Sequence, residues 1–267
     1  MTNADYIPWS CPVRGGKLYC RKYGNSSESL LLVHGACVDA DCFDETAALL
    51  SDQYSVYTFD RRGYGRNNSN EGGSLGLQSD DIRLLLERIG DNCVIIAHSA
   101  GYCPVIHCLE NHPDLVKGVL FYEPFALDIL PGKIGAEKIT AIQKQIDAQD
   151  YFVAAALFAR IIGSDESDVI PTESEIRHLE KNYRCFFRNE FSSLYQGKIN
   201  AGQISSSRIL VGLGNSSLST VRADMAEALA AKFNTRIILY PDGHNCPRVH
   251  PKEFAAITKK ALRSFFD

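Results

Sequence analysis

The chain has 267 residues, of which 45% are hydrophobic and 22% are charged, as is typical of globular proteins and not of disordered or fibrous ones. Its 28 Lys and Arg stand against 32 Asp and Glu, which gives a net charge of −4. Because the chain has no basic surplus and no basic run, neither a nucleic acid nor an anionic membrane is expected as a partner.

Nine cysteines are scattered along the chain, and no two of them have the C-x-x-C spacing. No metal site is therefore expected, and a chain of this length needs no metal or disulfide to form a core. Residues 1–5 carry no basic or apolar signal segment, and apolar runs such as 29–33 are far too short to span a membrane. These features predict a cytoplasmic protein with reduced thiols.

Strand and helix patterns alternate over the first 122 residues, which predicts an α/β fold with a mostly parallel sheet. Gly15 and Gly16 lie between two strand patterns, at 6–13 and 17–23, and predict a hairpin. Further strands are predicted at 30–33, 55–59, 93–98 and 116–122, and helices at 43–50, 79–89 (with Ser79 as N-cap after a loop at 72–77) and 100–111.

The alternation stops at residue 124. Residues 124–207 show helical patterns with little strand signal. Helices are predicted within 135–162 and 172–195, and alternation resumes with strands at 209–213 and 236–240 and helices at 220–232 and 252–266. The chain is therefore predicted to have a core formed by 1–123 and 208–267, with residues 124–207 inserted as a helical cap after the strand at 116–122.

A serine follows the buried strand pattern at 93–98, and a helix pattern begins immediately after it. This context forces a tight, strained turn at Ser99, where the flanking residues must be small because backbones crowd there. Ala97 and Gly101 meet that need. The five-residue pattern alone is also compatible with a structural serine, but its position between strand and helix favours a nucleophile.

Four ordered motifs carry a family resemblance: Leu32-Val33-His34-Gly35-Ala36, Asp60 to Arg66, the serine turn at 97–101, and Pro241-Asp242-Gly243-His244. Together they resemble the α/β-hydrolase family, in particular its serine-nucleophile members with a helical cap. The resemblance covers about residues 12–123 and 208–267. It implies a mostly parallel central sheet flanked by helices, but no single reaction, because this fold hosts many chemistries.

The resemblance also implies roles for individual residues. A serine hydroxyl needs a base to take its proton, and His244 has the position of that base. The backbone N–H groups of Ala36 and Ala100 are expected to bind the oxyanion, where one donor stabilises the transition state by roughly 2.7–4 kcal/mol. His34 and His98 are expected to support the site.

The acid of the triad departs from the common pattern. The family usually places an Asp after the strand that follows the cap, near Ser217 here, but residues 214–219 contain no carboxylate. Some members carry the acid after the strand that precedes the cap, which is the position of Glu123. The order Ser99, Glu123, His244 agrees with that of the fold. Two alternatives remain at this point: Glu123 as a polar strand end, or a dyad in which Asn215 or a serine orients the histidine.

Other residues of the four motifs and their neighbours have less specific expectations. His34, His98, Tyr102 and Phe125 are candidates for lining the substrate pocket, although core packing explains Tyr102 and Phe125 equally well. Asp60 is expected to organise its turn. Arg62 is expected to be a buried structural partner in preference to an anion contact.

The resulting hypothesis is a cofactor-free serine hydrolase. It would cleave an ester, thioester or lactone of a small molecule through an acyl-enzyme. The same scaffold could instead perform C–C hydrolysis, lyase or cyclase chemistry, or serve as a non-catalytic binding protein. Haloalkane dehalogenase and epoxide hydrolase chemistry is not expected, because those families carry an Asp at the position of Ser99.

Overall fold

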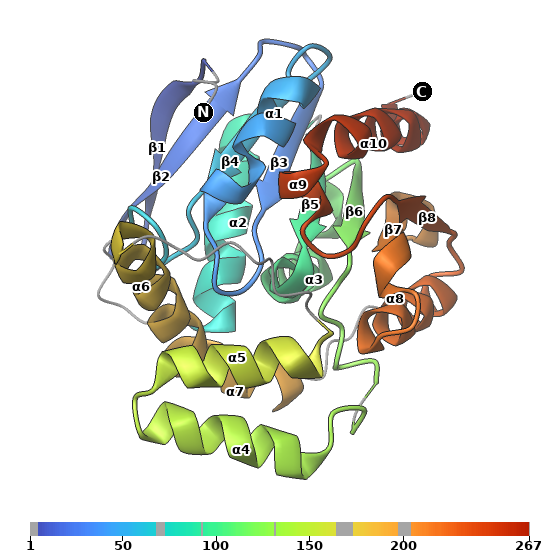
Figure 1. Cartoon of the computed structure of the whole chain (residues 1–267). Coiled ribbons are helices and arrows are strands. Elements are labelled where there is room, and N and C mark those ends of the chain that lie inside the picture. Colours follow the sequence, from blue (N-terminus) through green and yellow to red (C-terminus); the bar gives the residue numbers. More distant parts are fainter. Residues whose placement is uncertain are drawn as a thin grey trace.

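A computed structural model describes residues 5–67, 73–91, 93–130, 132–163, 173–196 and 204–266. Its centre is an eight-stranded sheet with the order β1-β2-β4-β3-β5-β6-β7-β8. The first two strands form the predicted antiparallel hairpin, β2 pairs antiparallel with β4, and the remaining pairs are parallel (Figure 1). The predicted mostly parallel α/β sheet flanked by helices is confirmed.

The strands are β1 (Ile7–Val13), β2 (Gly16–Tyr23), β3 (Ser29–Val33), β4 (Ser55–Phe59), β5 (Cys93–His98), β6 (Gly118–Tyr122), β7 (Ile209–Gly214) and β8 (Ile237–Tyr240). The helices are α1 (Asp44–Leu50), α2 (Leu75–Ile89), α3 (Tyr102–Asn111), α4 (Ala136–Asp147), α5 (Tyr151–Ile161), α6 (Glu173–Asn189), α7 (Phe191–Gln196), α8 (Val221–Lys232), α9 (Cys246–Val249) and α10 (Pro251–Phe266).

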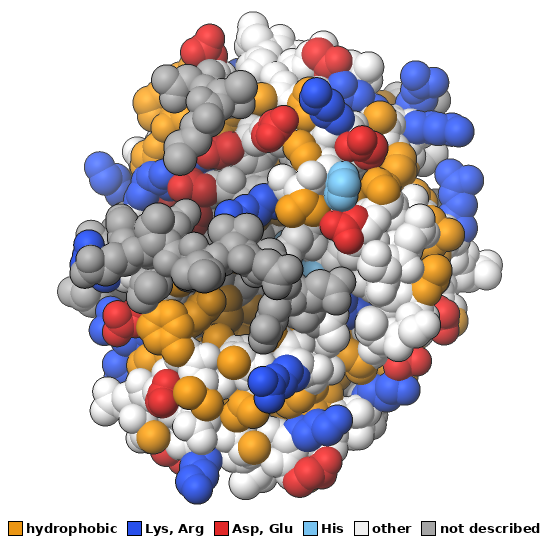
Figure 2. Space-filling model, viewed as in Figure 1, with side chains coloured by type: hydrophobic (Ala, Val, Ile, Leu, Met, Phe, Trp, Pro, Cys, Tyr) orange, Lys and Arg blue, Asp and Glu red, His pale blue; other side chains and the backbone are white. Residues whose placement is uncertain are grey.

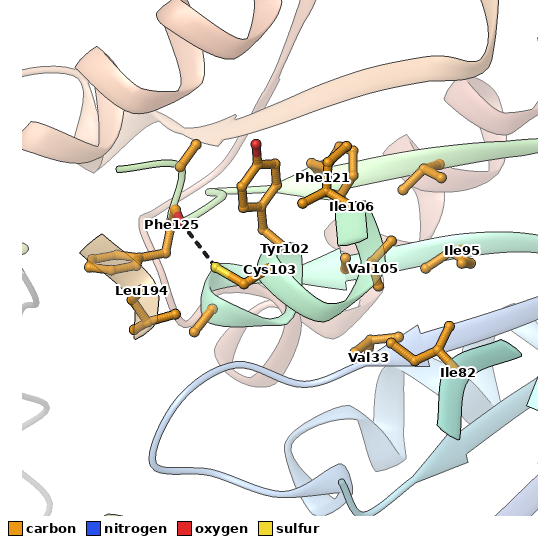
Figure 3. Packing of buried hydrophobic residues seen from close by; sticks show 14 of the residues in the cluster. Val33, Ile82, Ile95, Tyr102, Cys103, Val105, Ile106, Phe121, Phe125 and Leu194 are labelled. Carbon is orange, nitrogen blue, oxygen red and sulfur yellow. Dashed lines mark hydrogen bonds between the residues drawn. The ribbon is translucent and has the colours of Figure 1, made fainter. Parts of the chain in front are cut away.

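The central strands β3, β5 and β6 are buried along their whole length and mostly apolar, because both faces of the sheet are covered. Alternate residues of β3 belong to different core clusters: Leu30 and Leu32 pack on the side of α1 and α10, whereas Leu31 and Val33 pack on the other side. Figure 3 shows this second cluster, in which Val33 lies near side chains of α2 and α3. The alternation of side chains along a strand thus builds two cores on one sheet.

Helix α2 begins five residues earlier than predicted. Ser74 is its N-cap and accepts a hydrogen bond from the backbone of Leu77 at 3.4 Å. The prediction of Ser79 as N-cap was therefore wrong, as was that of a loop over residues 75–77, whereas residues 73 and 74 do lie outside the helix. Ser79 is buried within the helix. The helix extends to Ser74 because this serine supplies a cap, and because Gln78 in its first turn bonds the buried Arg61 at 2.6 Å.

The two helical patterns between residues 124 and 207 each divide into two helices. The first divides at Gln149, whose φ of 60° cannot continue a helix. Asp150 then caps α5 by accepting from the backbone of Val153 at 3.2 Å. The second divides at Glu190, between α6 and α7. The hydrophobic periodicity predicts where helices lie. It does not reveal a single residue whose backbone conformation ends one helix before the next begins.

Helices α4 to α7 lie beyond one end of the strands (Figure 1). Residues of the segment that contains them contact the backbone that follows two of these strands. Lys181 and Asn182 of α6 bond the backbone of Gly65, at 2.6 and 3.0 Å, in the loop after β4. Phe125 donates its backbone N–H to the carbonyl of Ser99, at 3.1 Å, directly after β5. These contacts join the segment to the carboxyl edge of the sheet, where open α/β sheets build their sites.

Five aromatic rings pack together within this segment. Phe158 of α5 lies with its ring centroid 5.4 Å from that of Phe125 and 5.2–6.1 Å from those of Phe186, Phe187 and Phe191. Phe158→Ala is expected to lower the free energy of unfolding by roughly 3–5 kcal/mol, because the cavity adds to the lost burial. Denaturant unfolding measures this loss. The matched control is Phe152→Ala on the same helix, where the side chain is 40% exposed, and equal losses would contradict the prediction.

All nine cysteines are free, and seven of them are buried. Burial raises the pKa of the Cys108 and Cys246 thiols to about 12, so both are protonated and unreactive at neutral pH. On the face seen in Figure 2, basic and acidic side chains are interspersed. No helix of the described residues is long and apolar enough to cross a membrane.

Candidate active site

Ser99 stands on a strained turn between β5 and α3. Its φ is 55°, in the left-handed region that ordinary residues avoid at a cost of roughly 1–3 kcal/mol. Two glycines make room for this turn. A Cβ on Gly35 would lie 2.8 Å from the Cβ of Ser99, and one on Gly101 would lie 2.8 Å from the carbonyl oxygen of Val33. The small residue expected at position 101 is therefore required by the approach of β3.

Glu123 and His244 meet beside this turn, although 121 residues separate them. Oε2 of Glu123 lies 2.8 Å from Nδ1 of His244, and Oε1 accepts from the backbone N–H of Gly214 at 3.0 Å. The glutamate side chain is fully buried, and its backbone has a φ of 44° directly after β6. A carboxylate accepts at Nδ1 only if that nitrogen carries the proton, which leaves Nε2 of His244 as an acceptor.

The ring of His98 packs against that of His244. Its centroid is 4.3 Å from that of His244, and its Nε2 lies 3.1 Å from the carbonyl oxygen of His244. Since a carbonyl only accepts, this nitrogen of His98 is the donor. The described side chains of Ser99 and His244 make no hydrogen bond to each other. In unliganded enzymes such contacts often form only when the substrate binds.

A positive charge lies on the far side of Glu123. Nη1 of Arg222, from the first turn of α8, is 3.4 Å from the same Oε2 that His244 contacts, and the arginine side chain is 3% exposed. Burial, and after it the charge of Arg222, holds the pKa of His244 well below its ordinary value of 6.5. The imidazole is thus neutral at neutral pH, which is the form that can take a proton.

This environment predicts an unusually low acid limit of activity. Because only neutral His244 is a base, and its pKa is lowered, kcat/KM is expected to remain on its plateau at pH 6.5 and to fall only in more acidic solution. Arg222→Met removes the cation, so the limit should move to higher pH. The measurement is kcat/KM against pH. Arg222→Lys keeps the charge and is the control; a limit that does not move in Arg222→Met would refute the prediction.

The two expected oxyanion donors flank Ser99 in different ways. Ala100 follows it directly and is buried, whereas Ala36 is half-buried and follows Gly35, the residue in contact with Ser99. Both amides therefore belong to backbone next to the serine. Ser217, where the family's usual acid would stand, is also buried, in the loop that leads from β7 to α8.

The four expected pocket residues occupy different environments. His34 is fully buried, accepts from the backbone of Arg61 at 2.9 Å and contacts the carbonyl of Gly35 at 3.0 Å, so it supports the turn and lines no open surface. Tyr102 is also buried, and its hydroxyl donates to Asp128 at 3.3 Å. Phe125, 4% exposed, faces α5 and α7, and its carbonyl contacts Cys103 (Figure 3).

The two neighbouring arginines of the motif after β4 differ. Arg62 forms a two-armed pair with Asp81 at 2.6 and 3.0 Å, the structural role that was favoured. Arg61 donates to the carbonyl of Gly35 at 2.9 Å, in the turn after β3 that approaches Ser99. Sequence reasoning missed both Arg61 and Arg222, because their partners come from distant parts of the chain and no local pattern marks them.

Asp60 accepts from the backbone of Ala40 and Arg66, as expected of a turn organiser.

The strand order, the serine on a strained turn after β5 and the histidine–carboxylate pair at the same sheet edge define an α/β-hydrolase architecture. A family model described as the alpha/beta hydrolase family matches residues 30–257. The chain belongs to the alpha/beta hydrolase family. The resemblance inferred from the four motifs is confirmed.

Individual proteins that are similar to this chain include two named hydrolases and an esterase of known structure. The chain is 26% identical to an uncharacterised hydrolase, YraK, of Bacillus subtilis, over 91% of each chain. It is 25% identical to 2-(acetamidomethylene)succinate hydrolase of Mesorhizobium japonicum, over 91% of this chain and 89% of that one. A thermophilic esterase from Thermogutta terrifontis has the same fold, with a TM-score of 0.67 and 17% identity over 98% of this chain and 100% of that one.

Proposed function

We propose that this protein is a serine hydrolase that cleaves an ester, thioester or lactone of a small molecule through an acyl-enzyme, without a cofactor. The observation that carries the proposal is the 2.8 Å contact between Nδ1 of His244 and Glu123. It leaves Nε2 of the histidine as the base, at the sheet edge where Ser99 is held on its strained turn. Residues of these three types perform acyl transfer on several unrelated folds, and the order Ser99, Glu123, His244 is the one that this fold uses.

The proposed reaction has two halves. Ser99 Oγ attacks the acyl carbon while His244 takes its proton, and the resulting oxyanion accepts from the N–H groups of Ala36 and Ala100. The protonated histidine then gives that proton to the leaving alcohol or thiol. In the second half His244 takes a proton from a water molecule, whose oxygen attacks the acyl carbon. The histidine then returns this proton to Ser99 Oγ as the bond between Ser99 and the acyl group breaks and the acid leaves. Glu123 stabilises the imidazolium that forms in both halves.

We also propose that residues 124–207 form a cap over the site. Two contacts support it: the bond between the backbone N–H of Phe125 and the carbonyl of Ser99, and the contact between Arg61 and Glu190 at 2.9 Å. The range includes residues outside the described part of the chain. A cap of this kind excludes water and shapes the substrate pocket. In the same proposal, the nine free thiols suit a reducing compartment such as the cytoplasm.

Fluorophosphonate labelling followed by ester turnover tests the proposal. A serine hydrolase reacts with the probe at Ser99 and then turns over short p-nitrophenyl esters, whereas a non-catalytic binding protein does neither. Labelling without turnover of any ester would favour the lyase or cyclase alternative. The substrate panel includes 2-(acetamidomethylene)succinate, because a relative of this chain is named for its hydrolysis.

A further inference from the structure

Arg61 links the Gly35–Ala36 turn to the segment that carries α6 and α7. Its side chain is 1% exposed. Nη2 donates to the carbonyl of Gly35 at 2.9 Å, while Nη1 donates to Gln78 at 2.6 Å and to Glu190 at 2.9 Å. Tyr64 donates its hydroxyl to the other oxygen of Glu190 at 2.7 Å. One buried guanidinium therefore holds three separate parts of the chain.

The carbonyl of Gly35 has a second donor. Nε2 of His34 accepts the backbone N–H of Arg61 at 2.9 Å, which assigns the ring proton to Nδ1. That nitrogen lies 3.0 Å from the same carbonyl oxygen and donates to it. The two donors lie in separate segments, His34 directly after β3 and Arg61 two residues after β4, and both hold this carbonyl in its direction.

Fixing a carbonyl also fixes the next amide. The peptide between Gly35 and Ala36 is trans, as are the others of the described residues, so the N–H of Ala36 points opposite to the held carbonyl. This peptide passes beside the nucleophile: a Cβ on Gly35 would lie 3.3 Å from Ser99 Oγ. The backbone N–H of Ala36 therefore points away from Arg61.

We propose that Arg61 is a positioning residue: by holding the Gly35 carbonyl, it aims the Ala36 N–H at the oxyanion that develops on the substrate. The inference rests on the proposed acyl transfer at Ser99. Glu190, between α6 and α7, holds the guanidinium in place. The ion pair of Arg61 and Glu190 therefore connects the Gly35–Ala36 turn to the helical segment. Donors held in advance stabilise a transition state because they need no reorganisation during the reaction.

A neighbouring pair provides a matched control. Arg62 and Asp81 are as deeply buried as Arg61 and Glu190, and their contacts are as short, at 2.6 and 3.0 Å. Arg62 also donates to a backbone carbonyl, that of Arg14, at 2.7 Å, but none of its bonds reaches the Gly35–Ala36 turn. Neutralising either pair removes a similar buried ion pair. Only the loss of the Arg61–Glu190 pair should lower kcat.

The test compares Arg61→Met/Glu190→Gln with Arg62→Met/Asp81→Asn. Each double variant removes both charges, so that no buried charge is left unpaired. With p-nitrophenyl acetate, the first is expected to lose about 10²–10³-fold in kcat, with KM changed only a few-fold. Inhibition by phenylboronic acid should weaken by a similar factor, because its adduct with Ser99 places a negative oxygen at the same position. The second should keep kcat and boronate affinity within a few-fold of the wild type.

Each outcome decides the inference. If the first double variant matches the second in kcat and boronate affinity, or loses kcat with unchanged boronate affinity, Arg61 has no role in positioning the donor. Should the first variant fail to fold, Arg61→Lys keeps a charge opposite Glu190 but lacks the two-armed fork. It should then lose at least about 10-fold in both measurements, and wild-type values would overturn the inference. Fluorophosphonate labelling of the wild type comes first, since its absence would overturn the proposed function itself.

Discussion

Ser99→Ala is expected to lower kcat by roughly 10⁴–10⁶-fold and to abolish fluorophosphonate labelling, because the attacking oxygen is removed. The fold should be retained, since alanine occupies no more space at a turn where Gly35 and Gly101 approach closely. The measurements are mass spectrometry after labelling, ester turnover, and circular dichroism as the check on folding. Full labelling of the variant would show that another residue is the nucleophile.

Ser99→Gly is the informative companion. It is equally inactive, but glycine adopts a φ of 55° without strain. It should therefore unfold at a higher temperature than Ser99→Ala. If the two variants unfold at the same temperature, the turn stores less strain than its backbone angle indicates.

Glu123→Gln is expected to cost about 10²–10⁴-fold in kcat while leaving Ser99 and His244 in place. Glutamine keeps the shape of the side chain but removes the charge that stabilises the imidazolium. Its amide can also present a donor to Nδ1, which would select the wrong tautomer. Steady-state kinetics measure the loss, and labelling by fluorophosphonate, slowed but not abolished, reports that the nucleophile is intact.

The control for this prediction is Asn215→Ala. Asn215 was the alternative partner for the histidine, and its side chain is exposed in the loop after β7, so kcat is expected to stay within a few-fold of the wild type. If Glu123→Gln instead behaves like the wild type, the protein works as a dyad of Ser99 and His244. Large losses in both variants would mean that the loop after β7 also orients the base.

The positions of Ser99, Glu123 and His244 could be predicted because each follows or faces the end of a strand. Parallel strands bring such positions to one edge of the sheet whatever their distance along the chain. Arg61 and Arg222 could not be predicted, because a buried arginine has no periodicity and its partners, Glu190 and Glu123, lie 129 and 99 residues away. The predicted helix boundaries were wrong at Ser74 and Gln149, because a capping side chain at the first and a backbone angle at the second outweigh the hydrophobic pattern.

The reactivity of the buried thiols can report local opening of the native protein. They are spread from Cys11 on the edge strand β1, through Cys93 in the centre of the sheet, to Cys246 at the start of α9. A protonated, enclosed thiol reacts with an alkylating reagent only when its surroundings open. Site-by-site alkylation rates would therefore rank the free energies of opening across the sheet, without any added label. The half-buried Cys37, next to Ala36, would report whether the Gly35–Ala36 turn changes its exposure when a fluorophosphonate occupies Ser99.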